Sequence, residues 1–182
     1  LTARQLYHRY QIQANLRVKD MPFLMGQHLY LDSEELESDD RIENAIKHGT
    51  LSIGFIGLAE TLTALTGKHH GESPEAEKLG LEIVAHMREK VDEFADKYNL
   101  NYTLLATPAE GLSGRFLSYD RDEFGTVTGV TDKEYYTNSF HIPVNYPISL
   151  FQKISLEGPY HKYRNAGHIS YVELASPPKI GR

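Results

Sequence analysis

The stretch Asn101-Tyr-Thr-Leu-Leu-Ala-Thr-Pro-Ala-Glu-Gly-Leu-Ser-Gly-Arg-Phe116 decides the fold, because it combines the pattern of a buried strand with that of a helix start. Its first half, Tyr102–Ala106, is a short apolar run typical of a buried strand. Pro108 ends this run, since it disfavours the helical conformation of the residue before it. We expect a helix to begin at Thr107, with threonine as the N-cap and Glu110 three residues later.

A strand that leads directly into a helix presents free backbone N–H groups at one point, which suits an anion such as a phosphate. Gly111, Ser113 and Gly114 would let a ligand approach the backbone closely. Two interpretations stay open at this point. One is a phosphate-binding turn, and the other is a capped helix with flexible glycines and no ligand. The local pattern alone slightly favours the second.

Composition limits the class of protein. The chain has 182 residues, long enough for one well-buried core, and no linker or low-complexity segment divides it. Its 19 basic and 25 acidic residues give a net charge of −6, and its longest basic run is Lys68–His70, so a nucleic-acid-binding surface is disfavoured. The sequence contains neither a run long enough to span a membrane nor a signal-peptide pattern, and we expect no membrane association.

Cysteine is absent from the sequence, which excludes disulfides, thiolate metal sites and cysteine chemistry within these residues. A cytoplasmic location is compatible with this composition. Because the sequence begins at Leu1 rather than methionine, we expect it to be a piece of a longer protein. His161 and His168 could share a metal ion with a carboxylate, but local hydrogen bonds are the commoner role of such histidines. The sequence therefore predicts no metal site.

A second informative stretch is Gly49–Glu60. Thr50–Phe55 has the β-branched and apolar residues of a buried strand, and Leu58–Leu65 has a helical pattern. Glu60 comes just after the strand, among apolar neighbours, at the kind of strand-to-helix corner where α/β folds bind ligands. A carboxylate there could act as a general acid or base, because burial disfavours its charged form. A structural carboxylate in the first turn of a helix is an equal alternative.

Other segments also have recognisable patterns. Ser73–Tyr98 begins with a serine cap, a proline and early acids, and predicts one long amphipathic helix. Its expected buried stripe is Leu79, Ile83, Met87, Val91, Phe94 and Tyr98. Tyr119–Gly125 is expected to form a charged turn, and Phe140–Val144 and Asn165–Leu174 are candidate strands. Beside the first of these strands are polar groups that could bind a sugar or fix an irregular loop, namely Tyr136, Asn138, Ser139 and His141.

Four motifs together resemble the anaerobic (class III) ribonucleoside-triphosphate reductases, which are oxygen-sensitive glycyl-radical enzymes. They occur in the family's order and cover essentially the whole chain: Gly49-Thr-Leu-Ser-Ile-Gly-Phe-Ile-Gly-Leu-Ala-Glu60, Thr107-Pro-Ala-Glu-Gly-Leu-Ser-Gly-Arg-Phe116, Asp132-Lys-Glu-Tyr-Tyr-Thr-Asn-Ser-Phe-His141 and Asn165-Ala-Gly-His-Ile-Ser-Tyr-Val-Glu173. The resemblance implies an α/β fold, about half of a ten-stranded α/β barrel of the glycyl-radical type. Residues 1–182 would form a single fragment of this catalytic barrel domain, without an internal boundary.

The resemblance also implies a chemistry. The family removes the ribose 2′-hydroxyl by radical chemistry, in which a glycyl radical generates a cysteine thiyl radical, and formate or a thiol system supplies the reducing equivalents. Glu60 matches the family's candidate acid or base near the ribose. A segment of this chain resembles the one that receives the substrate phosphates, and its residues are Thr107, Ala109, Glu110, Gly111, Leu112 and Ser113. Asn138, Ser139 and His141 would line the site.

The implied partners are a ribonucleoside triphosphate as substrate, a radical S-adenosylmethionine activating enzyme for the complete protein, and a second copy in a homodimer. The sequence departs from the family's pattern, since it has no cysteine and no Arg-Val-x-Gly-Tyr segment. The thiyl-radical residue, the glycyl radical and the structural zinc are therefore expected outside this chain, and the 182 residues alone are expected to be inactive. Two alternatives are a non-catalytic sugar-phosphate- or nucleotide-binding α/β module, and a structural fragment that only completes a barrel.

Overall fold

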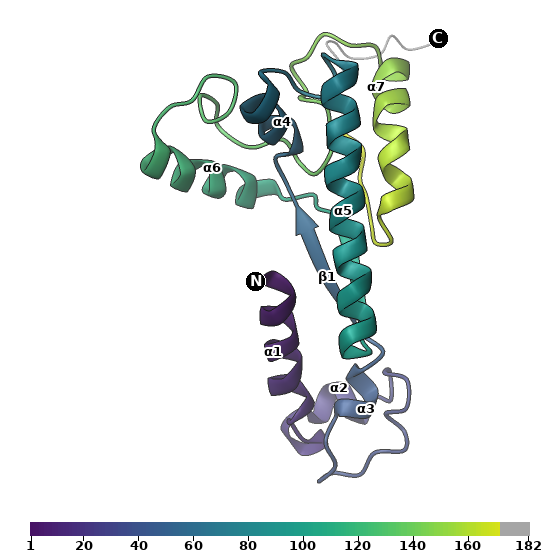
Figure 1. Ribbon diagram of the computed structural model, residues 1–182. Coiled ribbons are helices and arrows are strands. Elements are labelled where there is room, and N and C mark those ends of the chain that lie inside the picture. The colour runs from purple at the N-terminus through teal and green to yellow at the C-terminus, as the bar shows by residue number, and fades with distance from the viewer. Residues whose placement is uncertain (172–182) are drawn as a thin grey trace, which may run out of the picture. The chain divides into compact units, whose positions relative to one another are not determined.

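The computed structural model describes residues 1–171 (Figure 1). Its elements, in chain order, are α1 (Thr2–Ala14), η1 (Val18–Asp20), α2 (Pro22–Gly26), α3 (Glu43–Ile46), β1 (Thr50–Phe55), α4 (Leu58–Thr66), α5 (Pro74–Tyr98), β2 (Asn101–Ala106), α6 (Glu110–Phe124), α7 (Leu150–Glu157) and η2 (Gly158–Tyr163).

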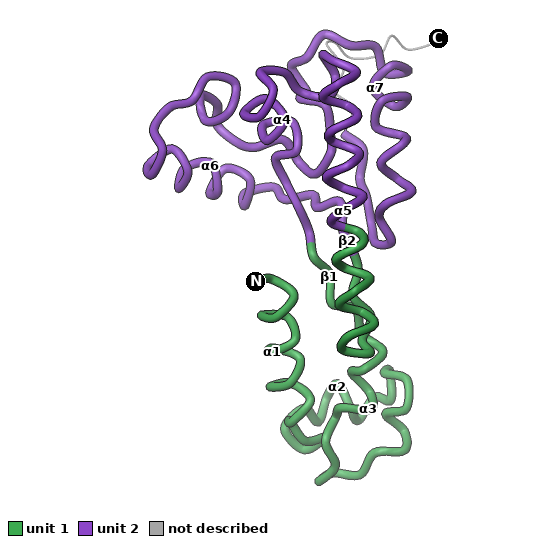
Figure 2. Tube along the Cα trace, viewed as in Figure 1, with its two compact units in different colours: residues 1–53, 88–103 green, residues 54–87, 104–182 purple. Residues whose placement is uncertain are grey.

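The chain divides into two compact units (Figure 2). Unit 1 comprises residues 1–53 and 88–103, and unit 2 comprises residues 54–87 and 104–182. The expectation of one barrel fragment without an internal boundary stays a prediction.

Strands β1 and β2 pair in a two-stranded sheet. The Asn101 amide donates to the Thr50 hydroxyl at 3.0 Å, and the hydroxyls of Ser52 and Thr103 are also 3.0 Å apart. Residue numbers therefore rise together along both strands, which run parallel. A parallel pair needs a long crossover connection, and α4 and α5 provide it. The predicted strands at 50–55 and 102–106 and the predicted α/β class are confirmed.

The prediction for the start of the third long helix is wrong. α6 begins at Glu110 rather than at Thr107, its N-cap is Ala109, and no side chain of its own first turn caps it. The Ala109 N–H instead donates to the side-chain oxygen of Asn138 at 3.2 Å. A residue 29 positions away thus satisfies a donor that local pattern assigned to Thr107.

The predicted charged turn at 119–125 is also wrong, because α6 continues to Phe124. Its charged residues bind the segment that follows the helix. The Tyr136 hydroxyl donates to Asp120 at 2.8 Å, and Arg121 Nε donates to the Thr131 carbonyl at 2.8 Å. These side chains therefore stabilise a helix at positions where composition indicated a turn.

The candidate strands late in the chain are not formed within the described residues. Residues 140–144 adopt turns and irregular backbone, and residues 165–171 are irregular as well. The remainder of the second candidate strand, residues 172–174, lies outside the described part. Phe140 is fully buried and its ring stacks on those of Tyr160 and His168, each at 5.1 Å between centroids. Apolar alternation at these positions thus reflects aromatic packing rather than strand pairing.

Unit 1 has its own apolar core. Met25, Ile42 and Ala45 are buried together, and partly buried residues surround them: Leu16, Val18, Met21, Leu24, Leu36 and Ile46. Helix α1 has no side-chain cap. Its first turn receives a hydrogen bond of 2.8 Å from the Tyr102 hydroxyl to the Ala3 carbonyl. Tertiary contacts therefore stabilise this helix where local capping does not.

Unit 2 buries its core between the ends of the strands, helices α4, α5 and α6, and the segment that precedes α7. The fully buried apolar side chains of this unit include Leu62, Val84, Leu104, Leu117, Phe140, Ile142 and Tyr160.

Helix α5 forms at the predicted place, but the face that it buries is rotated slightly from the predicted stripe. Its most buried positions are Ala76, Gly80, Val84 and Val91, whereas most of the predicted stripe is half-buried. Gly80 explains part of the difference, because a Cβ there would lie 2.5 Å from the Tyr160 hydroxyl. None of the helices within residues 1–171 combines the length and the apolar composition that a membrane span requires.

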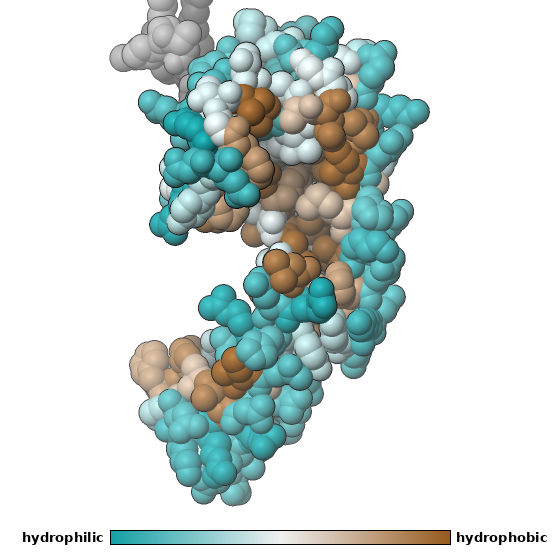
Figure 3. Space-filling model, turned by 60° about the vertical axis from the view of Figure 1, so that its left-hand side comes forward, coloured by the Kyte–Doolittle hydropathy of each residue, from teal (hydrophilic) through white to brown (hydrophobic). Residues whose placement is uncertain are grey.

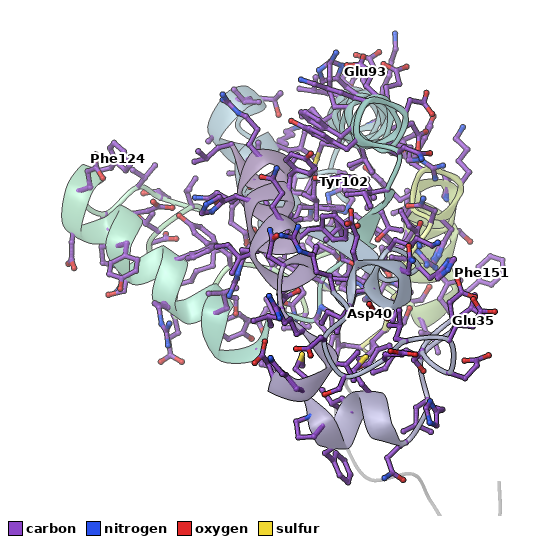
Figure 4. The ribbon with its side chains drawn as sticks, turned by 90° about the horizontal axis from the view of Figure 1, so that it is seen from below. Glu35, Asp40, Glu93, Tyr102, Phe124 and Phe151 are labelled. Carbon is purple, nitrogen blue, oxygen red and sulfur yellow. The ribbon has the colours of Figure 1, made fainter. Side chains whose placement is uncertain are left out.

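Apolar side chains also reach the surface of each unit (Figure 3). Phe124, at the C-terminal end of α6, is 67% exposed and Phe151 on α7 is 81% exposed, whereas Tyr102 is buried; Figure 4 labels these side chains. Other large exposed residues of unit 2 are Leu65, Phe116, Tyr119, Leu150 and Ile154. Exposed apolar residues that gather on neighbouring helix turns indicate surfaces suited to further contacts.

A test of the packing at the strand ends uses Gly54. A Cβ at this position would lie 1.8 Å from Oγ1 and 3.1 Å from Cβ of Thr107. We expect Gly54→Ala to lower the free energy of unfolding by about 1–3 kcal/mol, as overpacking does. Urea unfolding followed by circular dichroism measures this change.

The added Thr107→Ala substitution should recover part of the loss, because it removes the closest atom. Gly158→Ala is the matched control, since no atom lies within 4 Å of its added Cβ. Equal unfolding free energies for Gly54→Ala and the unaltered chain would contradict the packing described.

Candidate functional site

Glu60 lies in the first turn of α4, directly after β1. Gly57 forms the N-cap with φ of +77°, a conformation that L-residues with a Cβ rarely adopt. The N–H groups at this corner donate to a distant segment: Gly57 N–H to the Thr137 carbonyl at 2.7 Å and Leu58 N–H to the Ser139 carbonyl at 3.3 Å. Residues 137–139 therefore fix the turn that carries Glu60.

The Glu60 side chain is 2% exposed, and one of its oxygens accepts three hydrogen bonds. Oε1 accepts from Thr137 Oγ1 at 2.7 Å, Thr137 N–H at 3.2 Å and Lys133 Nζ at 2.9 Å. Burying a carboxylate is costly unless it is paired and hydrogen-bonded. The Lys133 ammonium and the two Thr137 donors supply that compensation.

The second oxygen of Glu60 is in a different situation. Oε2 is buried and has no hydrogen-bond partner among the described residues. Glu60 also lines a cavity of about 480 Å³, whose other walls are Ile56, Gly57, Thr61, Ala64, Leu65, Phe116, Tyr119, Asp120, Val130 and Tyr136. An unsatisfied buried acceptor beside a cavity indicates a place for a ligand that donates a hydrogen bond.

Asp120 and Tyr136 also line this cavity and are hydrogen-bonded to each other. Burial, and then the hydrogen bond to the Asp120 carboxylate, raise the pKa of the Tyr136 phenol above its usual value. Tyr136 therefore stays protonated and donates to Asp120. The cavity thus contains aromatic and apolar walls together with two carboxylates that can accept hydrogen bonds.

The turn at 107–113 approaches this site through Asn138. Ala109 N–H is occupied by the Asn138 side chain, and the Ser113 hydroxyl donates to the Glu110 carbonyl at 2.6 Å. Glu110, Gly111 and Leu112 are exposed, whereas Ser113 is buried. The N–H groups of Glu110 and Gly111 have no acceptor within the described part of the chain, so they are available to an anion.

A second cavity, of about 550 Å³, lies along the segment that holds both features. Its lining residues are Lys133, Glu134, Tyr135, Thr137, Asn138, His141, Pro143, Val144, Asn145 and Tyr171. This cavity is therefore lined by Lys133 and Thr137, which bind Glu60. It is also lined by Asn138, which binds the 107–113 turn. The structure brings together Glu60, Asn138 and this turn, as well as two residues that sequence reasoning missed, Lys133 and Thr137. Both belong to the quoted motif 132–141, which was the signal that could have found them.

Ser139 and His141 have different surroundings. Ser139 is fully buried with φ of +44° and its hydroxyl has no partner among the described residues. His141 is also buried; its Nε2 lies 2.8 Å from the Ile169 carbonyl and its Nδ1 lies 3.2 Å from Glu157 Oε1. Ser139 lies beside the Glu60 turn, whereas His141 belongs to a buried ion-pair cluster that reaches the second cavity.

Histidines that could have shared a metal ion have local partners. His161 Nδ1 accepts a hydrogen bond of 3.1 Å from Arg164 Nε, and His168 Nε2 lies 2.8 Å from the Ser170 hydroxyl. Over residues 1–171, no three acidic or histidine side chains converge in a way that could hold a metal ion.

With this geometry established, comparison with known proteins assigns the family. A sequence model of the family described as "Anaerobic ribonucleoside-triphosphate reductase" matches residues 1–180. The chain belongs to this family. It is similar to the anaerobic ribonucleoside-triphosphate reductases of Salmonella typhimurium (41% identity), Escherichia coli (40%) and Enterobacteria phage T4 (40%), each over 141 residues. These alignments cover 76% of the chain but 20%, 20% and 22% of the relatives. This reductase-family chain therefore spans about a fifth of the length of the curated relatives that it matches.

Glu157 makes a contribution to the free energy of unfolding that depends on pH. Burial alone would raise the pKa of Glu157, but hydrogen bonds from His141, Lys153 and the Ile142 N–H outweigh burial and lower its pKa to about 2. The pKa of an unperturbed glutamate is 4.5. Because the folded-state pKa is the lower one, the stabilisation is fully present above pH 4.5 and is lost as the pH falls through about 2.

We expect Glu157→Gln to lower the free energy of unfolding by about 3 kcal/mol at pH 7, because it leaves the buried Lys153 without its carboxylate. The difference between the two proteins should shrink as the pH falls from 4.5 toward 2. Urea unfolding at pH 7, 5, 4 and 3 measures it, with the exposed Glu82→Gln as a control. A difference that stays constant over this range would contradict the pairing.

Proposed function

We propose that the chain is part of an anaerobic ribonucleoside-triphosphate reductase, which reduces ribonucleoside triphosphates to 2′-deoxyribonucleoside triphosphates by glycyl and thiyl radical chemistry in the cytoplasm. This part contributes a catalytic carboxylate, Glu60, and the phosphate-binding turn at residues 107–113, within a ten-stranded α/β barrel. Membership of the family supports the reaction. The parallel strands joined by helices support a partial barrel.

The observation that carries the proposal is the unpartnered oxygen of Glu60. Oε1 is held by Lys133 and Thr137, so the carboxylate cannot turn freely, while Oε2 has no partner among residues 1–171. A ribose hydroxyl is a donor of the required kind. Held 2.6–3.2 Å from Oε2, it would give the carboxylate a proton to accept or return while the sugar reacts.

Lys133 and Thr137 orient the carboxylate in this proposal. Their donors fix Oε1 before substrate arrives, so no reorganisation is needed when a hydroxyl approaches Oε2. The radical centre, which we expect on residues outside this chain, would abstract the hydrogen atom from the ribose. The described residues of this chain bind the substrate, exclude water and hold the proton acceptor.

The phosphate role of the 107–113 turn is supported by two free N–H groups. Glu110 and Gly111 are exposed at the start of α6, a helix of 15 residues, and its N-terminus carries a partial positive charge. The triphosphate would bind these groups, and Thr107, Ala109, Leu112 and Ser113 would shape the turn. Asn138, Ser139 and His141 would line the site nearby.

The proposed partners of the complete protein are the ribonucleoside triphosphate, a radical S-adenosylmethionine activating enzyme and a second copy of the protein. The glycyl radical and the structural zinc of the complete enzyme would be held by residues outside this chain. Exposed apolar residues on α6 and α7 support contacts with further protein surfaces.

For the catalytic role we expect Glu60→Gln in the complete enzyme to lower kcat by roughly 100-fold or more, because the amide cannot accept the proton. The glycyl radical, measured by electron paramagnetic resonance after activation, should form to the same extent. Glu82→Gln is the matched control on the exposed face of α5. Unchanged turnover in Glu60→Gln would reject the catalytic role of Glu60. It would favour the alternative in which this part of the enzyme binds nucleotide and takes no part in the chemistry.

A second prediction concerns the 182 residues by themselves. They contain no cysteine, and the proposed reaction needs a thiyl radical. We expect the isolated chain to form no deoxyribonucleotide from any ribonucleoside triphosphate under anaerobic conditions, as measured by chromatography of the products. Deoxyribonucleotide formed above the no-protein blank would show that the reaction does not need the missing cysteine.

A further inference from the structure

Residues 137–139 contact both parts of the proposed site. The Thr137 hydroxyl and N–H donate to Glu60, and the carbonyls of Thr137 and Ser139 accept the N–H groups of the turn that carries it. Between these two residues, the Asn138 side chain accepts the Ala109 N–H of the 107–113 turn. One short segment therefore holds the carboxylate and the start of α6.

The backbone of Asn138 is itself fixed. It forms an antiparallel bridge with Ile56 at the end of β1, and its carbonyl accepts the His141 N–H at 3.0 Å. Adjacent side chains of an extended segment point to opposite sides. This alternation explains why Thr137 reaches Glu60 while Asn138 reaches the turn.

The N–H groups at the start of α6 differ in whether they have an acceptor. Asn138 occupies the first of them, and the Leu112 N–H donates to the Ala109 carbonyl at 2.8 Å. The N–H groups of Glu110 and Gly111, between these two, have no acceptor in residues 1–171. The N-cap residue that precedes these two groups is thus held by Asn138.

We propose that Asn138 is a positioning residue for phosphate binding, which holds the start of α6 so that the Glu110 and Gly111 N–H groups face the substrate's phosphates. The inference rests on the proposed function and adds a residue role to it. In this role Asn138 acts through Ala109, to which its side chain is hydrogen-bonded, rather than by binding the phosphate itself. The hydrogen bond, rather than the volume of the side chain, carries the effect.

The test uses the complete enzyme with Asn138→Ala. Equilibrium binding is measured with three probes: a ribonucleoside triphosphate, the unphosphorylated ribonucleoside and inorganic tripolyphosphate. We expect Kd for the triphosphate and for tripolyphosphate to rise roughly 3- to 10-fold, the effect of one lost hydrogen bond. Kd for the ribonucleoside should change less than 2-fold. Asn44→Ala, on the exposed face of α3 in unit 1, is the control.

A second variant removes the other half of the hydrogen bond. Ala109→Pro deletes the N–H at a residue whose φ of −85° is close to that of proline. If both substitutions act through the same bond, the Kd of the double variant for tripolyphosphate should be no higher than the larger of the two single-variant Kd values. Additive losses would mean that Asn138 acts by another route and would overturn the proposal.

The remaining outcomes separate this inference from the proposed function. Unaltered enzyme that binds the triphosphate no better than the ribonucleoside, and tripolyphosphate not at all, would overturn the phosphate turn and with it the role of Asn138. Phosphate-dependent binding that survives Asn138→Ala unchanged would overturn the role of Asn138 alone. Equal weakening of all three probes would show that Asn138 only maintains the fold, and would also overturn it.

Discussion

The burial of the Glu60 carboxylate is the constraint on which unit 2 depends. A charge that is 98% removed from solvent is tolerated only with donors close to it, and α4 supplies none of those observed. They come from Lys133 and Thr137, 73 and 77 residues further along the chain. The segment 133–139 must therefore lie against the corner between β1 and α4, and the Gly57 and Leu58 N–H groups bind it there.

Once that segment is in place, it determines where α6 can lie. Asn138 binds the start of the helix at Ala109, Tyr136 binds Asp120 in its third turn, and Arg121 donates to the Thr131 and Lys133 carbonyls. Contacts at three levels fix the helix along its length, including the two free N–H groups at its start. The proposed proton acceptor, Glu60, and the proposed phosphate anchor are thus positioned by the same stretch of backbone, which is a physical basis for coupling between them.

Sequence pattern predicted the elements whose stability is local. The strands at 50–55 and 102–106, the helix after Gly57 and the long helix from Pro74 all follow from periodicity, glycine and proline positions and capping. Predictions were wrong where tertiary contacts outweighed a local signal. Asn138 binds the N–H of Ala109, and α6 begins at Glu110. Asp120 and Arg121 bind the segment after α6, and the helix continues through the expected turn. Phe140 stacks on Tyr160 where a strand was expected.

By itself, the sequence determined the α/β class, the family to which its four motifs point, and Glu60 as the notable carboxylate, because these depend on residue types at fixed spacings. Tertiary structure alone decided that Glu60 has one oxygen bound by Lys133 and Thr137 and one without a partner. It also decided that Asn138 joins the 107–113 turn to the same segment. No local pattern encodes these contacts, because each joins residues from 29 to 77 positions apart whose proximity follows only from the packing of unit 2.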